Sequence, residues 1–349
     1  PETMQASVLT GVGSIVLEER PVPVPDPDQV LIQVGSVGVC GSDVHYYEHG
    51  RIGDFVVEQP LILGHEAGGR IVAVGSGVDP ARIGQRVSIE PQRCCRVCWF
   101  CRSGQYNLCP HMEFYATPPI DGAFCEYVTI QDDFAFSIPD SISDHAAAMM
   151  EPLSVGIAAV QKGGLSAGQS ILIAGAGPIG ILTAQVARAY GAAEVVVSDL
   201  NAHRRELALS YGATKVVDPA NESAEDMGAD VFVDAAGAVP AILSGIRSVR
   251  AGGQVILVGS ADEFPLSVAE IAMREVNVTG TFRYTNTWPI ARTLLTQGLV
   301  EVDSLVTHVY GLDQVEESLR ADNTPDALKR VVLPGVDRVE DPALAARQA

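Results

Sequence analysis

The sequence predicts an α/β protein of two domains, one mainly β and the other built on a doubly wound parallel sheet. A chain of 349 residues is long enough for about two domains. Between about residues 4 and 140, short strand-like runs lie between Gly and Pro, and helical patterns are sparse. From residue 170 to about 280, apolar runs alternate with helical patterns, as such a sheet requires. We assign residues 1–153 and 286–349 to the first domain and residues 154–285 to the second.

The first domain begins with strands. Its strand candidates are residues 30–34, 69–74 and 86–89, each bounded by Gly or Pro. Residues 21–25 alternate Pro with Val, which favours an extended segment. The Ala-rich stretch 143–161 predicts a helix that leads into the second domain.

The second domain is expected to contain six parallel strands, and the chain then returns to the first domain. The strand candidates are residues 170–174, 195–197, 216–217, 230–234, 254–258 and 276–279. After residue 286 we expect a helix, a strand near Val306, and a final helix and strand. The residues after Gly335 are expected to form a loose tail.

The start of the second domain carries a dinucleotide-binding pattern. The strand 170–174 runs into Gly175-Ala-Gly-Pro-Ile-Gly180, a helical pattern follows to Tyr190, and the strand 195–197 ends at Asp199. The glycines permit a tight turn, close approach of a pyrophosphate and close helix packing, and Asp199 would accept hydrogen bonds from the ribose hydroxyls. The alternative is a structural glycine turn in another parallel-sheet protein.

Charge and cysteine content limit the partners. The net charge of −20 repels nucleic acid and acidic lipid, so we expect neither as a partner. Seven cysteines, four of them clustered, favour metal binding over disulfides and a reducing, cytoplasmic location. No signal peptide and no apolar run of membrane-spanning length are evident in the sequence.

Three residues predict a catalytic metal site. Cys40 follows a strand-like segment, and His65-Glu66 follows a second apolar run. Together they offer one sulfur, one nitrogen and one oxygen, and three protein ligands with an open fourth position are typical of catalytic zinc. Taken singly, Cys40 is more often a small buried residue and His65-Glu66 a surface pair.

A second cluster predicts a structural metal site. Cys95, Cys98, Cys101 and Cys109 have the spacing C-x2-C-x2-C-x7-C, and four thiolates close a tetrahedral shell around zinc. Cys94 is a competitor for the first position, but Cys95 gives the more even spacing. Cys94 and Cys125 are then left over as ordinary thiols. A zinc ribbon that binds nucleic acid is the alternative, disfavoured by the negative charge of the chain.

The chain resembles the zinc-dependent medium-chain dehydrogenases, and within them the sorbitol (polyol) dehydrogenases. The motifs that carry the resemblance are Cys40-Gly-Ser-Asp-Val-His, Gly64-His-Glu-Ala-Gly, Glu151-Pro-Leu-Ser-Val-Gly, the glycine turn and Phe282-Arg-Tyr-Thr-Asn-Thr-Trp-Pro. The resemblance covers essentially the whole chain. It implies a GroES-like, mainly β catalytic domain with a structural-zinc lobe at about residues 93–110, and a Rossmann domain for the nicotinamide.

The resemblance also implies roles for individual residues. Cys40, His65 and Glu66 would bind the catalytic zinc, and Glu151 would reach it directly or hold its bound water. Ser42 and His45 would relay the proton, and Asp43 would accept a hydrogen bond from the second ring nitrogen of His65. The residues implied at the substrate are Tyr46, Phe114, Thr117, Glu151, Arg283 and Tyr284. Those implied at the cofactor are Gly175, Gly177, Pro178, Ile179, Gly180, Asp199, Arg204, Val258, Gly259, Ser260, Phe282 and Arg283.

These observations favour an NAD-dependent zinc dehydrogenase that oxidises a secondary hydroxyl of sorbitol, xylitol, L-iditol or a related sugar alcohol to the ketose. The carboxylate of Asp199 disfavours the 2′-phosphate of NADP, although Arg204 and Arg205 lie near enough to soften that preference. Glu113 and Tyr115 flank Phe114 and depart from the family pattern, which leaves the preferred chain length of the polyol open. The alternatives are a diol or threonine dehydrogenase and an inert zinc-stabilised NAD-binding protein. A homo-oligomer, either a dimer or a tetramer, is expected by resemblance.

Overall fold

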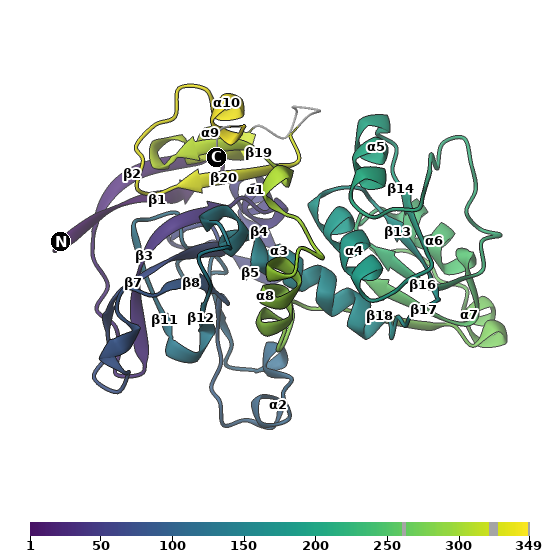
Figure 1. Ribbon diagram of the computed structural model, residues 1–349, viewed down its shortest axis with the longest axis horizontal. Coiled ribbons are helices and arrows are strands. Elements are labelled where there is room, and N and C mark those ends of the chain that lie inside the picture. The colour runs from purple at the N-terminus through teal and green to yellow at the C-terminus, as the bar shows by residue number, and fades with distance from the viewer. Residues whose placement is uncertain (260–262, 321–326, 348–349) are drawn as a thin grey trace. The chain divides into compact units, whose positions relative to one another are not determined.

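The computed structural model describes residues 1–259, 263–320 and 327–347, and these form two compact units. Unit 1 comprises Pro1–Glu151 and Val302–Ala349, and unit 2 comprises Pro152–Glu301 (Figure 1). The predicted fold class is confirmed, since one unit is mainly β and the other is a parallel α/β sheet.

Residues 286–301 group with unit 2, whereas the sequence assigned them to the first domain. A reciprocal pair of hydrogen bonds joins the end of this segment to unit 2. The side chain of Gln185 donates to the carbonyl of Glu301 at 2.8 Å and accepts from its N–H at 2.9 Å. A sequence pattern contains no sign of this pairing over 116 residues.

Unit 1 is organised around a seven-stranded sheet in the order β12-β8-β7-β3-β20-β19, with β11 also paired to β3. Its strands are β3 (Gln29–Gly38), β7 (Glu66–Val74), β8 (Arg86–Ile89), β11 (Tyr127–Gln131), β12 (Ala135–Ser137), β19 (Val306–Gly311) and β20 (Lys329–Leu333). Smaller sheets contain β1 (Thr3–Gly11), β2 (Ser14–Pro21) and β6 (Leu61–Ile62), then β4 (Arg51–Ile52) with β5 (Phe55–Val56), and β9 (Gln92–Arg93) with β10 (Glu113–Phe114).

The helices of unit 1 are short. They are α1 (Gly41–His49), α2 (Trp99–Arg102), α9 (Val315–Arg320), α10 (Pro342–Ala346) and the 3-10 turns η1 (Pro80–Arg82), η2 (Tyr106–Leu108), η3 (Asp132–Phe134), η4 (Asp303–Leu305) and η5 (Leu312–Gln314). The longer helix α3 (Asp144–Lys162) begins in unit 1 and continues into unit 2. Among the described residues, no helix combines the length and the apolarity that crossing a bilayer requires.

Helix α1 is the main element that the sequence analysis missed, and its start can be explained by a local side-chain cap. Asp43 occupies the third helical position, and its carboxylate accepts the backbone N–H of Cys40 at 2.9 Å. This bond satisfies a donor that the helix start leaves unpaired. The helix ends at Gly50, whose φ of 69° is costly for any residue with a Cβ.

The chain end is also more ordered than expected. Residues after Gly335 were predicted to form a loose tail, yet α10 lies there with Asp341 as its N-cap. Two alanines of this helix, Ala345 and Ala346, pack on the small apolar cluster of β19 and β20. This tertiary contact outweighs the weak local signal.

Unit 2 contains six strands, and every pairing between neighbours is parallel. The order is β15-β14-β13-β16-β17-β18, formed by β13 (Ser170–Ala174), β14 (Glu194–Ser198), β15 (Lys215–Val217), β16 (Ala229–Asp234), β17 (Val249–Leu257) and β18 (Asn277–Gly280). All six predicted strands of this sheet are confirmed. The helices are α4 (Pro178–Ala189), α5 (Ala202–Ser210), α6 (Val239–Ser248), α7 (Val268–Arg274) and α8 (Trp288–Thr296).

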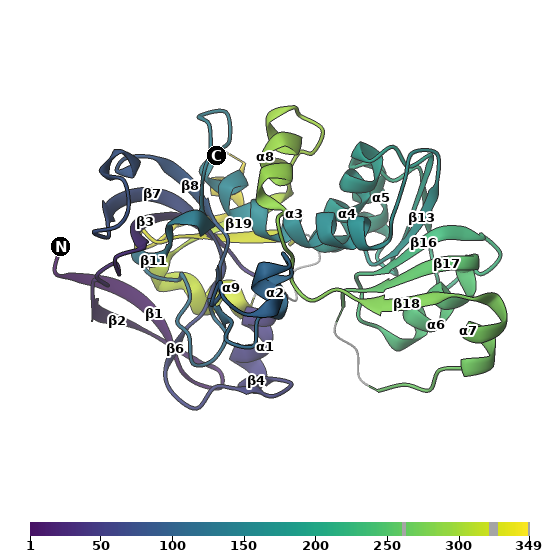
Figure 2. The same ribbon diagram turned by 90° about the horizontal axis from the view of Figure 1, so that it is seen from below.

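The topology of unit 2 locates its binding site. Helices α4 and α5 cover one face of the sheet, and α6 and α7 cover the other (Figures 1 and 2). The strand order β15-β14-β13-β16-β17-β18 changes direction between β13 and β16. In open α/β sheets, ligands bind outside the carboxyl ends of the strands at such a reversal.

Candidate functional site

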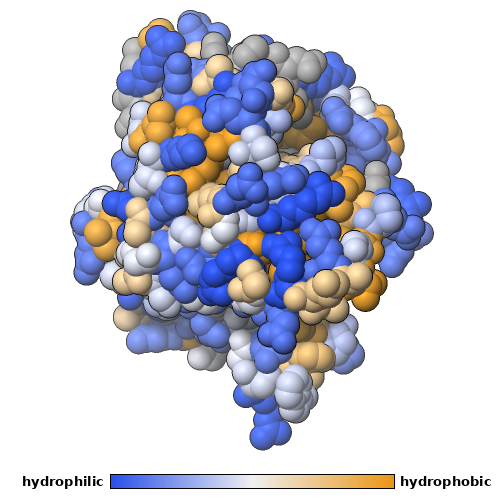
Figure 3. All heavy atoms as spheres, turned by 90° about the vertical axis from the view of Figure 1, so that its right-hand side faces the viewer, coloured by the Kyte–Doolittle hydropathy of each residue, from blue (hydrophilic) through white to orange (hydrophobic). Residues whose placement is uncertain are grey.

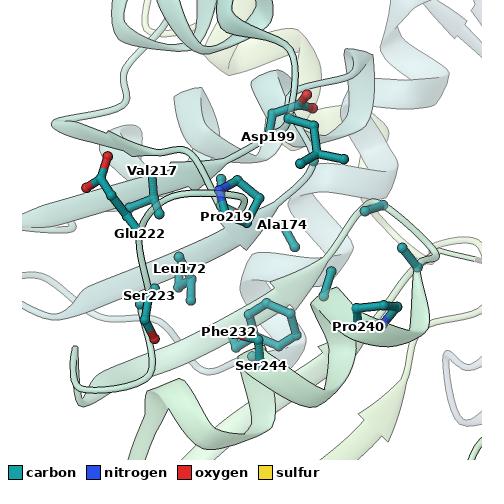
Figure 4. A pocket seen from close by; sticks show the side chains of 18 of the residues that line it. Leu172, Ala174, Asp199, Val217, Pro219, Glu222, Ser223, Phe232, Pro240 and Ser244 are labelled. Carbon is teal, nitrogen blue, oxygen red and sulfur yellow. The ribbon is translucent and has the colours of Figure 1, made fainter.

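A cavity of about 530 Å³ lies at the carboxyl ends of the central strands of unit 2. Figure 4 shows Leu172 and Phe232 at its apolar floor, with Asp199 at one rim and Glu222 on the loop opposite. Its lining also includes Gly175, the first glycine of the predicted turn. The cavity thus lies where the strand order reverses, and it has an apolar interior with carboxylates at its edge.

The glycine turn has the geometry that the sequence predicted. Gly175 has a φ of 96°, and a Cβ on Gly180 would stand 1.8 Å from the Gly175 carbonyl oxygen. A Cβ on Gly177 would meet no atom within 4 Å, so this stretch of backbone faces open space. The turn leads into α4, which begins at Pro178 and directs its free N–H groups toward that space. Pro178 and Ile179 are the first two residues of this helix.

Asp199 is held firmly at the cavity rim. One carboxylate oxygen accepts the N–H of Ala176 at 2.7 Å, and the other accepts the N–H of Asn201 at 2.7 Å. The first bond joins the glycine turn to the end of β14, and the second fixes the loop that follows this strand. Because each carboxylate oxygen has two lone pairs, both can still accept a hydroxyl donor.

The remaining predicted cofactor residues of this unit lie on neighbouring loops. Val258 and Gly259 follow β17, and both N–H groups donate to the carbonyl of Asp234 at 3.0 Å. Ser260 lies outside the described residues. Arg204 lies in the first turn of α5, where its N–H donates to the side chain of Asn201 at 3.1 Å.

In unit 1 the structure brings together Cys40, His65 and Glu66. Their ligand atoms all lie within 4.8 Å of one another. Cys40 caps α1, and His65 precedes β7, on which Glu66 is the first residue. His65 and Glu66 are buried, at 7% and 1% exposure. Three ligands from two chain segments that are distant in sequence therefore meet at one end of the large sheet.

The chemistry of this group fits a zinc ion. Burial, reinforced by the Glu66 carboxylate, raises the pKa of the Cys40 thiol to about 11. A thiolate at Cys40, beside the Glu66 carboxylate, is costly unless a cation such as zinc neutralises it. Sulfur, imidazole and carboxylate donors are the ligand types that zinc prefers.

Asp43 supports the group in a way that differs from the prediction. Its carboxylate accepts the N–H of Cys40 and the N–H of Gly64, each at 2.9 Å. The ring nitrogen Nδ1 of His65 lies 3.7 Å from the nearer oxygen, too far for a hydrogen bond. Asp43 thus fixes the two backbone segments that carry the ligands, and the expected hydrogen bond to His65 is not formed.

Lys329 is a residue of the site that the sequence analysis missed. Its ammonium nitrogen lies 2.6 Å and 2.5 Å from the two carboxylate oxygens of Glu66, and it donates to the carbonyl of Val39 at 3.0 Å. It is 3% exposed. Lys329 comes from β20, 263 residues after Glu66. No local pattern distinguishes it from a surface lysine, so only the fold reveals it.

The second cluster is formed by Cys95, Cys98, Cys101 and Cys109, whose sulfurs lie within 4.8 Å of one another. The backbone N–H groups of Cys98 and Cys101 point at the sulfurs of Cys95 and Cys98, at 3.4 Å and 3.5 Å. Hydrogen bonds from backbone N–H groups, that of Val97 first, lower the pKa of the Cys95 thiol to about 6. Burial instead raises the pKa of the Cys101 and Cys109 thiols, so a cation is needed to stabilise all four as thiolates. Four sulfurs grouped in this way leave no open position, as a structural zinc requires.

The two remaining cysteines lie outside this group. Cys94 and Cys125 are buried, at 7% and 1% exposure, and both pack in the core of unit 1. The structure thus groups Cys95, rather than Cys94, with the other three thiols.

The predicted relay residues both lie on α1. Ser42 hydrogen-bonds to the Cys40 sulfur. His45 is exposed one turn further along the helix, and its ring stacks on that of His49 with centroids 4.5 Å apart. One residue therefore touches the metal group and the other faces solvent.

The predicted aromatic substrate residues of unit 1 are buried. Tyr46 is 4% exposed, and Phe114 lies against His65 with ring centroids 5.5 Å apart. The next residue, Tyr115, points into the core instead, where its hydroxyl donates to the carbonyl of Thr129 at 2.6 Å. On the other side of Phe114, Glu113 forms an ion pair with Arg93. The two departures from the family pattern thus have structural partners of their own.

The other predicted substrate residues are divided between the units. Thr117 follows the same strand, and its N–H donates to the carbonyl of Phe114 at 3.1 Å. Glu151 is buried on α3 and is not one of the three residues whose ligand atoms cluster within 4.8 Å. In unit 2, Arg283 stacks over Phe282 at 4.6 Å, and Tyr284 is buried edge-on against Trp288.

Comparisons with known proteins cover most of the chain. An alcohol dehydrogenase GroES-like domain matches residues 26–140, and a zinc-binding dehydrogenase domain matches residues 178–297. A sorbitol dehydrogenase of Bacillus subtilis is 44% identical over 329 residues, which is 91% of this chain and 93% of that protein. The sorbitol dehydrogenase of Homo sapiens is 42% identical over 89% of this chain and 90% of its own length. The structure of 2R,3R-butanediol dehydrogenase from Bacillus subtilis matches with a TM-score of 0.87 at 30% identity, covering 95% of this chain and 99% of that one.

Proposed function

This chain belongs to the zinc-dependent medium-chain dehydrogenases, in the group of the sorbitol dehydrogenases, and from that membership we propose its function. It is an NAD-dependent zinc polyol dehydrogenase that oxidises a secondary hydroxyl of a sugar alcohol to the ketose. Sorbitol, xylitol and L-iditol are the substrate types that we propose. The observation that carries this proposal is the close group of Cys40, His65 and Glu66 in a chain so similar to sorbitol dehydrogenases.

Cys40, His65 and Glu66 hold the catalytic zinc in this proposal. Zinc in such a site acts as a Lewis acid that lowers the pKa of a substrate hydroxyl, and NAD accepts the hydride from the adjacent carbon. Two of the three ligands, His65 and Glu66, are buried, whereas Cys40 is half-buried. The pairing of Lys329 with Glu66 keeps the carboxylate fixed before metal binds.

The hydroxyl proton needs a path to solvent. Ser42 touches the Cys40 sulfur, and His45 is exposed one turn later on the same helix. A hydroxyl can accept and donate a proton at once, and a histidine exchanges protons near neutral pH. We therefore assign Ser42 to receive the proton and His45 to release it to water.

Substrate recognition is assigned to polar groups. Glu151 would hold the water of the catalytic zinc rather than bind the metal, since it lies outside the group of three close ligands. Arg283, Tyr284, Phe114, Tyr46 and Thr117 remain proposed substrate contacts. A polyol site selects substrates because each buried donor or acceptor left unpaired by a poorer ligand costs free energy.

The cofactor is assigned to unit 2. The turn from Gly175 to Gly180 and the start of α4 bind the pyrophosphate, and Asp199 binds the adenosine ribose. Arg204, Val258, Gly259 and Phe282 remain proposed cofactor contacts. The four-cysteine group holds the structural zinc, which stabilises the lobe without taking part in the reaction.

A substrate panel tests this assignment. Purified protein with zinc and NAD is offered sorbitol, xylitol, L-iditol, 2,3-butanediol and threonine, and NADH formation is followed by absorbance. We expect kcat/KM for a polyol to exceed that for the diol and for threonine by at least about tenfold, which corresponds to one well-made hydrogen bond. Equal or higher kcat/KM for the diol would contradict the polyol assignment.

A diol dehydrogenase is the second candidate, because the butanediol dehydrogenase structure matches almost the whole chain. The number of polar side chains at the substrate separates the two. Replacing Arg283 with Ala would weaken polyol turnover far more than diol turnover if the chain is a polyol enzyme. An inert NAD-binding protein would oxidise no member of the panel.

The assembly and location are also proposals. Strand β18 lies at the edge of the parallel sheet, paired only with β17 among the described strands, which supports a homo-oligomer through strand addition. Figure 3 shows that hydrophobic and hydrophilic residues are interspersed on one face of the molecule, which is typical of a surface that stays in contact with water. Light scattering would give the subunit number, and a monomeric mass would contradict this part. The seven unpaired thiols support a cytoplasmic location, which cell fractionation would test.

A further inference from the structure

The charged residues around the cavity of unit 2 are all acidic. Asp199, Glu222 and Glu225 contribute to its lining, and no Lys, Arg or His is found among its described lining residues. Asp199 and Glu222 stand on opposite sides of the opening in Figure 4. A 2′-phosphate on the adenosine ribose adds negative charge, so NADP needs a cation that this lining does not supply.

The guanidinium of Arg205 lies beside Asp199 but is not part of the cavity lining, and it has three partners. One terminal nitrogen donates to the carbonyls of Asp199 and Leu200 at 2.7 Å and 2.9 Å. The other lies 3.1 Å from a carboxylate oxygen of Asp218. The side chain is 16% exposed. Two carbonyls and a carboxylate therefore fix the guanidinium, and moving it to a ligand would break all three contacts.

Asp218 is well suited to hold this arginine. It lies between Val217 and Pro219, which both line the cavity, although Asp218 itself does not. Its carboxylate also accepts the N–H of Ala220 and the side-chain amide of Asn221, each at 3.1 Å. The hydrogen bond from Ala220, followed by those from Asn221 and the charge of Arg205, lowers the pKa of Asp218. The residue is thus charged at neutral pH and its position is set by the loop.

We propose that Asp218 is a second residue that determines specificity for NAD. Its ion pair with Arg205 prevents this guanidinium from binding the 2′-phosphate of NADP. Asp199 repels that phosphate, and Asp218 occupies the arginine that could otherwise bind it. This inference rests on the proposed dinucleotide function of unit 2. It implies that replacing Asp199 alone leaves NADP a poor ligand.

The test compares five variants with the wild type: Asp199→Ser, Asp218→Asn, the double variant, and the double variant combined with Arg205→Ala or, separately, with Arg204→Ala. The dissociation constants of NADH and NADPH are measured by fluorescence. The kcat/KM values for NAD and NADP are measured with the best polyol. Asp218→Asn keeps an acceptor for Ala220 while its amide presents a donor toward Arg205, which breaks the pair. Circular dichroism and the melting temperature verify that each variant is folded.

Asp199→Ser should weaken NADH binding and improve NADPH binding only slightly. Adding Asp218→Asn should tighten NADPH binding by a further factor of about ten, the size of one charge-assisted hydrogen bond. Adding Arg205→Ala should abolish that gain. The matched control is Asp230→Asn, because Asp230 also pairs with an arginine, Arg250 at 2.8 Å, and also accepts a backbone N–H, that of Ser170. On the Asp199→Ser background it should leave the NADPH-to-NADH ratio unchanged.

Two outcomes would overturn the proposal. One is full NADPH binding by Asp199→Ser with no further gain from Asp218→Asn. The other is a gain in NADPH affinity in the double variant that survives Arg205→Ala but disappears with Arg204→Ala. Arg204 is the competing cation because its Nε is buried without a hydrogen-bond partner. Failure of the proposed function would look different, since neither cofactor would support polyol oxidation while the two binding constants remained measurable.

Discussion

The two cysteine-bearing groups of unit 1 bind the same metal type in this account but are built in opposite ways. The four-cysteine lobe takes all its ligands from residues 95–109 and closes its coordination shell. The catalytic group takes Cys40 from one segment and His65-Glu66 from another, and Lys329 joins it from the other end of the chain. A local cluster can therefore form its site within one loop, whereas the catalytic site exists only once the large sheet has folded.

The largest expected effect is produced by metal removal. Three ligands and an open position hold zinc less completely than four thiolates, so a chelator should extract the catalytic zinc first. Turnover should fall by several orders of magnitude while one zinc per chain and most of the melting temperature remain. Metal content, activity and melting temperature are measured along the same time course, and added zinc should restore activity. Loss of both metals in a single phase would contradict the contrast between the sites.

The lobe should instead respond in stability. Cys98→Ser removes one of the four thiolates, and the lobe should lose its zinc together with several kcal/mol of folding free energy. The catalytic group lacks this residue, so turnover per folded molecule should fall much less than with the chelator. Denaturant unfolding and zinc analysis measure the two effects. A variant with unchanged stability and only one zinc would mean that the lobe does not depend on its metal.

Lys329 provides a third way to separate the groups, because the cation beside Glu66 is part of the protein. Removing one partner of a buried ion pair leaves an uncompensated charge, so Lys329→Met should destabilise the metal-free protein by about 3–5 kcal/mol. Bound zinc would take over the neutralisation of Glu66, and the zinc-loaded variant should lose less. Denaturant curves with and without zinc test this, with the exposed Lys215→Met as control. Equal losses in both states would contradict a role for Lys329 beside the metal.

The smallest effect is expected at Glu90, which links the lobe to the sheet. Its fully buried carboxylate accepts hydrogen bonds from Tyr106 in the lobe at 2.7 Å and from Gln92 at 2.9 Å. Burial raises the pKa of Glu90 from 4.5 to about 8. Between these values the unfolded chain binds fewer protons than the folded one, so folding stability falls as pH rises and levels off above pH 8.

Glu90→Gln should remove this decline, because the amide has no proton to lose and still offers an oxygen to Tyr106. The variant should gain about 1–3 kcal/mol over the wild type at pH 8 and should match it near pH 4. Unfolding curves at the two pH values measure the difference. A wild-type stability that rises between pH 5 and pH 8 while that of Glu90→Gln stays flat would have the wrong sign for a carboxyl of raised pKa.

The local parts of the molecule were predictable from the sequence, and the reason is physical. The turn at Gly175–Gly180 is defined by residues within one strand-turn-helix unit, and β13 and α4 begin where the pattern placed them. The four-cysteine group likewise depends on spacing within one loop. In both cases the residues that make the structure are near neighbours in the chain.

The features that the sequence did not reveal depend on partners distant in sequence, or on which of several possible partners a side chain binds. Nothing in the sequence around Lys329 distinguishes it from a surface lysine. The pairing of β20 with β3 brings it to Glu66. Asp43 was expected to bind His65, but its carboxylate lies on the backbone N–H groups of Cys40 and Gly64, and the His65 ring nitrogen stays 3.7 Å away. A one-dimensional pattern does not show which of these donors the carboxylate meets. Arg205 was expected to soften the cofactor preference, yet Asp218 holds it.

The most direct test of the catalytic assignment is the zinc content and polyol turnover of Cys40→Ala. Cys40 supplies the sulfur of the group with His65 and Glu66, and nothing in the four-cysteine lobe depends on it. We predict about one zinc per folded chain, a melting temperature close to that of wild-type protein after chelation, and no measurable NADH formation. Two retained zincs, or turnover within about tenfold of wild type, would show that the reaction does not run through this group.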